Sequence, residues 1–238
     1  MGTIRFLCFN IHGGYSRGGK RDLGRVHKLL DRYDIDIAAF QEMETRPSRG
    51  GKASDIDRLA GGTRPFHLPG PTLKEGQGWY GNLIVSRYPI LKAKAHTMET
   101  TPDLEPRNAI DALIQTPYGK IRLLNTHLSL SLFERRREIP KLIELIRAVE
   151  KEESAPVFLM GDINEWNPFS RLLHFLNTVL IPVPVRPTFP SMLPFLKLDR
   201  IWHDSTRLRV TARTLRGRSV AALSDHLPVL IEAEFSAT

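Results

Sequence analysis

Nine short apolar runs, spread along the whole chain, most constrain how this sequence can fold. They lie at residues 4–9, 35–40, 82–86, 109–115, 121–126, 157–160, 198–202, 207–214 and 229–235. Their length and their β-branched and aromatic residues are typical of strands. Several are almost entirely apolar and do not alternate with polar residues, which indicates strands that are buried on both faces. We therefore expect a core built between stacked layers.

Helical periodicity appears in three places between these runs. Asp22 is expected to cap the first helix, and Ser131 with Glu134 three residues later resembles a capping box that starts the second. Pro140 lacks a backbone donor and is expected to kink or restart that helix. The third helix is expected to begin at Asn167 and Pro168. Strands and helices in this arrangement favour an α/β fold.

The composition places the chain among globular proteins. Its 238 residues are 41% hydrophobic and 25% charged, and we expect residues 1–238 to form one domain. The single cysteine, Cys8, excludes an intramolecular disulfide. No stretch approaches the roughly 18 to 20 apolar residues that span a bilayer. These features favour a cytoplasmic protein whose only membrane contact would be peripheral.

An excess of basic residues gives the chain a formal net charge of +8, from 34 Lys and Arg against 26 Asp and Glu. This charge favours an anionic partner such as nucleic acid or a membrane surface. A basic surface that only keeps the protein in solution is an equally ordinary explanation. The motifs must therefore decide between these partners.

Two long segments carry the composition of loops. Residues 45–63 are rich in Gly, Ser, Arg and Asp, and residues 180–196 contain five prolines. Long loops in a compact domain are usually functional or mobile. The second loop also holds the apolar residues Val183, Val185, Phe189, Met192, Leu193 and Phe195. These side chains either cover the core or, when exposed, suit a lipid or another apolar substrate group.

Polar residues that can do chemistry stand where the apolar runs stop. Those that follow a run are Asn10, Gln41, Glu42, Thr126, His127, Asp162 and Asn164, and Asp225 and His226 precede the last run. Sheets of α/β proteins place sites at strand ends, because loops converge there on a rigid support. Carboxylates and amide oxygens, without a second cysteine, suit a hard cation such as Mg²⁺ better than zinc. The set points to phosphate chemistry.

Seven short motifs, in this order, resemble those of the endonuclease/exonuclease/phosphatase superfamily. They are Phe9-Asn10-Ile11, Gln41-Glu42, Gly81 to Arg87, Asn125 to Leu128, Gly161 to Asn164, Leu198 to Ile201 and Ser224 to His226. The resemblance spans almost the whole chain. It implies a four-layer α/β sandwich of two mixed β-sheets with helices outside, and a metal-dependent phosphohydrolase.

The resemblance also implies a metal site. Glu42 would be the main Mg²⁺ ligand, with Asn10 and Asp225 near the metal and some of these contacts made through water. Mn²⁺ is the alternative ion. The partner would be an anionic phosphate ester.

Catalytic roles follow from the same resemblance. Asp162 would orient or deprotonate the attacking water, and Asn164 would hold that water or a phosphate oxygen. His226 would donate to the phosphate in the transition state, with Asp199 fixing its tautomer. His127 would supply a second donor from the opposite side. Positioning and charge neutralisation of this kind are what phosphoryl transfer requires.

Three further polar residues could contribute to the site. Arg107 is a candidate for binding the substrate phosphate because a guanidinium matches phosphate oxygens, although a surface ion pair is commoner. Asn82, within the third motif, is a second candidate for substrate binding. His12 is not assigned to the site, because a solvated turn histidine is as frequent before two glycines.

Three functions fit these residues. The first is a nuclease-like Mg²⁺-dependent phosphodiesterase or phosphatase that uses direct attack of water, with nucleic acid slightly favoured by the net charge. The second is a sphingomyelinase-like or phospholipid phosphodiesterase that uses the apolar loop. The third is a catalytically inactive binding protein with the same fold. The presence of the complete set of polar residues argues against the third.

Overall fold

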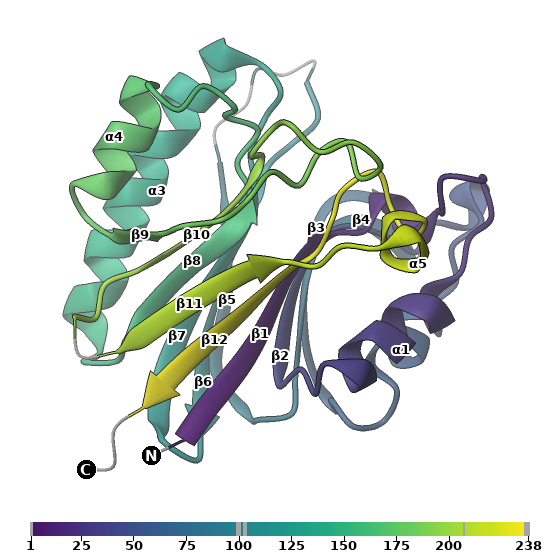
Figure 1. Cartoon of the computed structure of the whole chain (residues 1–238), viewed down its shortest axis with the longest axis horizontal. Coiled ribbons are helices and arrows are strands. Elements are labelled where there is room, and N and C mark those ends of the chain that lie inside the picture. Colours follow the sequence, from purple (N-terminus) through teal and green to yellow (C-terminus); the bar gives the residue numbers. More distant parts are fainter. Residues whose placement is uncertain (1, 99–100, 102–103, 207, 236–238) are drawn as a thin grey trace.

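Two β-sheets of six strands each pack face to face, with helices on both outer surfaces (Figure 1). The structure is a computed structural model that describes residues 2–98, 101, 104–206 and 208–235. The four-layer sandwich of two mixed sheets expected from the sequence is confirmed.

The first sheet contains both ends of the described chain. Its strands are β1 (Gly2–Asn10), β2 (Ile37–Glu44), β3 (Phe66–Glu75), β4 (Gly78–Ser86), β11 (Arg209–Thr214) and β12 (Val229–Phe235). They are ordered β11-β12-β1-β2-β4-β3. β1 and β2 run parallel and the other neighbours run antiparallel, so the sheet is mixed.

The second sheet repeats this pattern around another parallel pair. Its strands are β5 (Ile90–Thr97), β6 (Asn108–Thr116), β7 (Gly119–His127), β8 (Val157–Asp162), β9 (Ile181–Val183) and β10 (Asp199–His203). They are ordered β5-β6-β7-β8-β10-β9. β7 and β8 run parallel, and the remaining pairs are antiparallel.

Helices form the two outer layers. Those on the first sheet are α1 (Leu23–Arg32), α2 (Asp55–Ala60) and α5 (Arg218–Ala221), and those on the second are α3 (Leu132–Glu152) and α4 (Arg171–Asn177). Two 3₁₀ turns, η1 (His12–Gly14) and η2 (Pro47–Arg49), complete the described elements. Helix α2 and turn η2 lie inside residues 45–63, which the sequence suggested to be a loop. Among the described helices, none is both long and apolar enough to cross a bilayer.

Each central strand sends alternate side chains into two different cores. In β1, Leu7 and Phe9 enter the core under α1, whereas Phe6 enters the core between the sheets. In β8, Phe158 points between the sheets and Leu159 points toward α3 and α4. Because both faces of these strands are buried, their sequences need no polar alternation.

Three strands fall outside the nine apolar runs, and all three lie at sheet edges. β3 carries Pro69, Gly70 and Pro71 and pairs only with β4, β5 is mostly exposed, and β9 has three residues. Edge strands tolerate proline and solvated side chains because one side has no ladder to complete. They therefore lack the apolar signal of central strands. Arg207, the first residue of one expected run, lies outside the described residues.

Helix α3 starts at the expected place without the expected cap. The side chain of Ser131 accepts no capping hydrogen bond. The carboxylate of Glu134 instead accepts from the backbone N and the Oγ1 of Thr101, at 3.0 and 2.5 Å. The helix then continues through Pro140 and does not restart there. Packing of its apolar face on the second sheet outweighs the one missing donor.

The other two helix starts also differ from expectation in detail. Helix α1 follows Asp22, but the Asp22 side chain makes no capping hydrogen bond. Helix α4 begins at Arg171, four residues after Asn167. Its cap is Ser170, whose Oγ accepts from the backbone N of Leu172 at 3.2 Å. A serine cap satisfies one of the free amides of the first turn, and it places the helix start more strongly than the Asn-Pro pair does.

A buried carboxyl group ties α3 to the loop that leaves β7. Oε2 of Glu138 accepts from the backbone N of Ser129 at 2.9 Å, while its buried Oε1 has no partner among the described residues. Burial raises the pKa of Glu138 to about 7, against the lowering effect of the Ser129 amide and of Arg107. The folded state therefore binds this proton more tightly than the unfolded state does.

Stability should consequently fall as pH rises from the ordinary carboxyl pKa toward 7. Replacing Glu138 by Gln removes the titration. Wild type should lose stability between about pH 5 and about pH 8, whereas Glu138→Gln should not. The unfolding free energy of the variant minus that of wild type should therefore be about 1 to 3 kcal/mol larger at pH 8 than at pH 5. Urea unfolding at both pH values measures this. A difference that does not change with pH would contradict the assignment.

The inter-sheet core provides a second prediction. The rings of Phe6 and Phe158, from opposite sheets, lie 4.9 Å apart and both are fully buried. Phe158→Ala should lower the free energy of unfolding by about 3 to 5 kcal/mol, because it leaves a cavity between the sheets. The control Leu91→Ala, on the exposed edge strand β5, should change it by less than about 0.5 kcal/mol. Equal losses in urea unfolding would show that the inter-sheet contact is not special.

Candidate functional site

Strand ends from both sheets meet at one end of the sandwich. Asn10 ends β1, Glu42 lies near the end of β2, and His127 and Asp162 end the parallel pair β7 and β8, where they stand opposite each other in register. Asp199 begins β10 and pairs with Asp162 in the antiparallel ladder. The ends of β1 and β8 and the start of β10 lie at the same end of the molecule (Figure 1).

A cavity of about 470 Å³ opens at this end. The lining side chains are His12, Glu42, Tyr80, Glu105, Arg107, His127, Leu130, Arg135, Asp162, Asn164, Trp166, Phe189, Leu196, Leu198, Asp225 and His226. Most of the residues singled out by the motifs are therefore brought together. Asn10 and Asp199 lie directly beneath, bonded to lining residues.

The amide of Asn10 joins carboxylates from both sheets. Its Nδ2 donates to Oε1 of Glu42 at 2.7 Å and to Oδ2 of Asp162 at 3.0 Å. Its Oδ1 accepts from the backbone N of His12 at 3.0 Å. Because Asn10 is fully buried, every polar atom of its side chain is fixed in direction.

Glu42 reaches the cavity through an irregularity in β2. The pairing of β2 with β4 shifts register between Phe40 and Met43, and Glu42 itself has a φ of 58°. A positive φ is uncommon for a non-glycine residue and is found where the surroundings impose it. Burial would raise the pKa of Glu42, but the hydrogen bonds from the His12 imidazole and the Asn10 amide lower it to about 2. The carboxylate is therefore ionised.

His12 belongs to this cluster although the sequence left it unassigned. Its Nδ1 lies 3.6 Å from Oε2 of Glu42 and 3.7 Å from Oδ2 of Asp225. The interaction with Glu42 raises the pKa of His12, against a smaller opposing effect of burial. The residue has a φ of 47° in the turn η1, which directs the ring toward the two carboxylates. Its place two residues after Asn10, before two glycines that permit such a turn, is the signal that could have identified it.

His226 is paired with one carboxylate and faces another. Its Nδ1 lies 2.8 Å from Oδ2 of Asp199, and its Nε2 lies 3.6 Å from Oδ2 of Asp162. Burial lowers the pKa of this histidine, but the charges of Asp199 and Asp162 outweigh burial and raise it to about 10. The ring is cationic at neutral pH and packs against Phe189, with centroids 5.0 Å apart.

Asp162 is the centre of the cluster. Its Oδ2 faces the Nε2 atoms of His127 and His226, each at 3.6 Å. Its Oδ1 accepts from the backbone N of Asn164 at 3.1 Å. Burial raises the pKa of Asp162, the His226 cation opposes this, and the Asp199 carboxylate adds to it. The preceding Gly161 lets β8 approach β7, because a Cβ there would lie 1.9 Å from the backbone oxygen of Thr126.

The tautomer of His127 follows from its neighbours. Arg107 Nη1 lies 3.1 Å from Nδ1, and a guanidinium can only donate, so Nδ1 of the neutral ring accepts. The ring proton is then on Nε2, which faces Oδ2 of Asp162. Burial, followed by the charge of Arg107, lowers the pKa of His127 to about 3. His127 is thus a neutral donor, whereas His226 is a cationic one.

Asn164 holds the opposite wall. It adopts a φ of 53°, and its Nδ2 donates to the backbone oxygen of Leu128 at 2.8 Å. The same Nδ2 lies 3.2 Å from Nε2 of His127, but with the ring proton on Nε2 this contact joins two donors and is not a hydrogen bond. Asparagine is among the residues that enter the left-handed region most readily, which explains its presence at this turn.

The two candidates for substrate binding have different positions. Arg107 lines the cavity, where its Nη1 donates to Oε1 of Glu105 at 2.8 Å and its buried Nε has no partner among the described residues. Asn82 does not line the cavity. It is 1% exposed and its Nδ2 donates to the backbone and side-chain oxygens of Asn108, which leaves it no direct access to a substrate.

Hard oxygen donors suit a divalent cation at Glu42. The ionised carboxylate of Glu42 and the partly exposed carboxylate of Asp225 both face the cavity and already hold the imidazole of His12 between them. Carboxylate oxygens with room for water are the surroundings that Mg²⁺ prefers. The donor set therefore fits such an ion.

A second group could also hold a metal ion. Ligand atoms of Asp162, Asp199 and His226 lie within 4.8 Å of one another and are buried. The 2.8 Å contact between Asp199 and His226 is, however, the length of a charge-assisted hydrogen bond, which already accounts for those two groups.

Comparisons with known proteins agree with this geometry. The chain is 28% identical over 247 residues to the uncharacterized protein YbhP of Escherichia coli K12, which covers 97% of this chain and 96% of that protein. The fold also matches a solved structure of an endonuclease/exonuclease/phosphatase from Beutenbergia cavernae. That match covers 100% of this chain and 72% of the Beutenbergia chain, with 18% sequence identity and a TM-score of 0.80. A second match, to the solved structure of the mannosyl-6-phosphatase Bt3783 of Bacteroides thetaiotaomicron, covers 98% of this chain and 100% of the Bt3783 chain, with 16% sequence identity and a TM-score of 0.76.

The two solved structures share the fold of this chain. A model of the Endonuclease/Exonuclease/phosphatase family matches residues 7–226, a range that includes every residue of the cavity. On the extent of that match, the chain belongs to the endonuclease/exonuclease/phosphatase family.

Proposed function

We propose that this chain is a Mg²⁺-dependent phosphoester hydrolase in which water attacks phosphorus directly. Members of its family are hydrolases that act on phosphoester bonds. The observation that carries the proposal is the pair of hydrogen bonds from Asn10 to Glu42 and Asp162. They hold a metal-binding carboxylate beside a buried carboxylate that can act on water.

The metal would be held by Glu42 and Asp225, with Asn10 in the adjoining position. When bound, it supplies positive charge that neutralises phosphate oxygens and polarises the ester. Oxygen ligands favour Mg²⁺, with Mn²⁺ as a substitute.

Asp162 and Asn164 are assigned to the attacking water. The raised pKa of Asp162 makes its carboxylate a stronger base than an exposed one. Its Oδ1 is fixed by the backbone N of Asn164, so the carboxylate keeps one orientation while it takes the proton. Positioning of this kind supplies much of the rate in phosphoryl transfer.

The two histidines are assigned to the phosphate from opposite sides. His226, held by Asp199 through Nδ1, presents a cationic Nε2–H, and His127, held by Arg107, presents a neutral one. Both Nε2 atoms face the same oxygen of Asp162, so a phosphate beside that oxygen meets both donors. Donors fixed before reaction stabilise the charge that develops in the transition state.

The net charge of +8 favours an anionic substrate but does not identify its class. Nucleic acid and anionic lipid satisfy the charge equally well. An inactive binding protein would keep the same fold but would have no use for two histidines in opposite protonation states around one carboxylate.

The test uses bis(p-nitrophenyl) phosphate with Mg²⁺ or with EDTA. Wild type should release p-nitrophenol only with the metal. Glu42→Gln and Asp162→Asn should each lower kcat by about 10² to 10⁴-fold, because one removes metal binding and the other the base.

The matched control is Glu44→Gln, which removes a buried carboxylate from the same strand, paired with Arg46 outside the cavity. Its kcat should stay within about threefold of wild type. Turnover that persists in EDTA would refute the metal requirement. Equal losses in the Glu42 and Glu44 variants, with circular dichroism unchanged, would refute the site.

A further inference from the structure

The large hydrophobic side chains that are more than half exposed gather in three segments of the described chain. They are Leu130, Phe133, Trp166, Phe169, Met192, Leu193 and Phe195, which we call the apolar rim. Phe169 is 91% exposed, and Leu130 and Leu193 are 78% and 77% exposed. Clustered exposure of this kind marks an interaction surface.

The apolar rim borders the mouth of the catalytic cavity. Leu130 and Trp166 line that cavity themselves. The segment with Met192, Leu193 and Phe195 is a loop closed by a bridge between Phe189 and Leu196, which both line the cavity too. All three exposed segments therefore start from the walls of the site.

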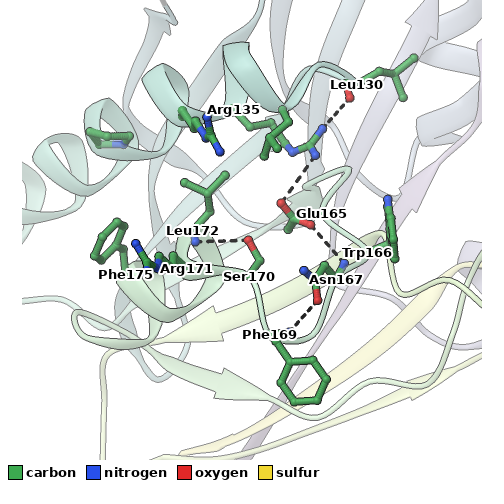
Figure 2. Close-up of a pocket in the computed structure, with 13 residues that line it drawn as sticks. Leu130, Arg135, Glu165, Trp166, Asn167, Phe169, Ser170, Arg171, Leu172 and Phe175 are labelled. Carbon is green, nitrogen blue, oxygen red and sulfur yellow. Dashed lines mark hydrogen bonds and ion pairs between the residues drawn. The ribbon is translucent and has the colours of Figure 1, made fainter.

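A second cavity, of about 820 Å³, adjoins the first and shares Leu130, Arg135 and Trp166 with it. In Figure 2, Leu130 and Phe169 lie at opposite edges of this group, with Trp166 between them. The rim thus continues from the catalytic cavity over the start of α3 and the loop before α4.

Outside the catalytic cavity with its carboxylates, the exposed charges that border the rim are basic. In the described chain, the exposed charged residues that line the second cavity and two smaller neighbouring cavities are Arg136, Arg171, Lys197, Arg216 and Arg218. Glu165, the carboxylate that lines the second cavity, is buried, and its Oε2 lies 3.5 Å from Nη2 of Arg135. Arg137 adds a cation over the ring of Phe133, 4.3 Å from its centroid. An anionic surface complements this border.

The chemistry of the rim favours lipid over nucleic acid. Leu130, Met192 and Leu193 are aliphatic and offer no ring on which a base could stack. A bilayer interface accepts aliphatic and aromatic side chains together, with tryptophan at headgroup level. Basic residues around such side chains add attraction to anionic headgroups.

We propose that the apolar rim docks on an anionic phospholipid bilayer, so that the ester cleaved is a phospholipid headgroup phosphodiester; this rests on the proposed hydrolase. Docking brings the cavity mouth to the level of the lipid phosphates. Water then adds its oxygen to phosphorus and one ester P–O bond breaks. One proton of the water goes to the departing alkoxide and the other to the new phosphate monoester, which leaves an alcohol and a monoester.

The binding test is cosedimentation with vesicles of phosphatidylcholine, with or without phosphatidylglycerol. Wild type should sediment with the anionic vesicles, and less so at high salt. The variant Phe169→Ser with Leu193→Ser should lose about tenfold or more of this binding, because two side chains leave the interface. The control Leu91→Ser with Tyr118→Ser alters two half-exposed hydrophobic side chains at the opposite end of the second sheet, and its binding should match wild type. Equal losses in the two variants would overturn the docking surface.

The activity test separates docking from chemistry. Neither Phe169 nor Leu193 lines the catalytic cavity, so their double variant should hydrolyse bis(p-nitrophenyl) phosphate like wild type while losing about tenfold or more of its turnover of vesicular phosphatidylglycerol. A wild type that cleaves the small ester but neither binds nor cleaves vesicles would overturn the lipid proposal alone. Loss of single-stranded DNA hydrolysis in the rim variant, without vesicle binding by wild type, would assign the rim to nucleic acid. Absence of small-ester turnover with vesicle binding intact would refute the proposed hydrolase and, with it, the lipid substrate.

Discussion

Buried amide hydrogen bonds fix how the two sheets sit on each other, and the site depends on that fixed relation. Asn125, in β7, donates to the backbone oxygens of Phe40 and Leu83 in the other sheet, at 2.9 and 3.2 Å, and accepts from Nε2 of Gln41 at 2.7 Å. Two apolar faces alone would tolerate small relative shifts. A shift here would leave buried polar groups unpaired, at about 1 to 3 kcal/mol each. One arrangement of the sheets is therefore strongly preferred.

The candidate site lies across the same junction. Glu42 comes from the first sheet and Asp162 from the second, and the Asn10 amide bridges them. The register shift that turns Glu42 toward the cavity begins at Phe40, whose oxygen accepts from Asn125. The Asn125 hydrogen bonds that align the two sheets therefore act on the same part of β2 that places the Glu42 carboxylate beside Asp162. Burial disfavours the charged form of both His127 and His226. At His127 the Arg107 cation adds to this effect, whereas at His226 the carboxylates outweigh it, so the two rings differ in protonation.

Central strands and strand ends could be predicted from the sequence, because burial on both faces leaves an unbroken apolar run and the site residues stand where such runs stop. The edge strand β11 was also among the expected runs, but β3 and β5 could not be predicted, since they are solvated and carry no such run. Asn82 and His12 show the corresponding limit at the site. Whether a polar residue faces a cavity or a neighbouring strand depends on backbone geometry, such as the φ of 47° at His12, and local residue types do not reveal it.

Exposure of the apolar rim raises a physical problem that its charged border resolves. Side chains as exposed as Phe169 and Leu193 would favour association of copies of the chain through their rims. The basic residues around them repel a second copy, because identical cations would be brought together. The same cations attract an anionic surface, where the apolar side chains can leave water without that repulsion. Under the proposed docking, the basic border would keep rims apart from each other and would direct them toward a surface of opposite charge.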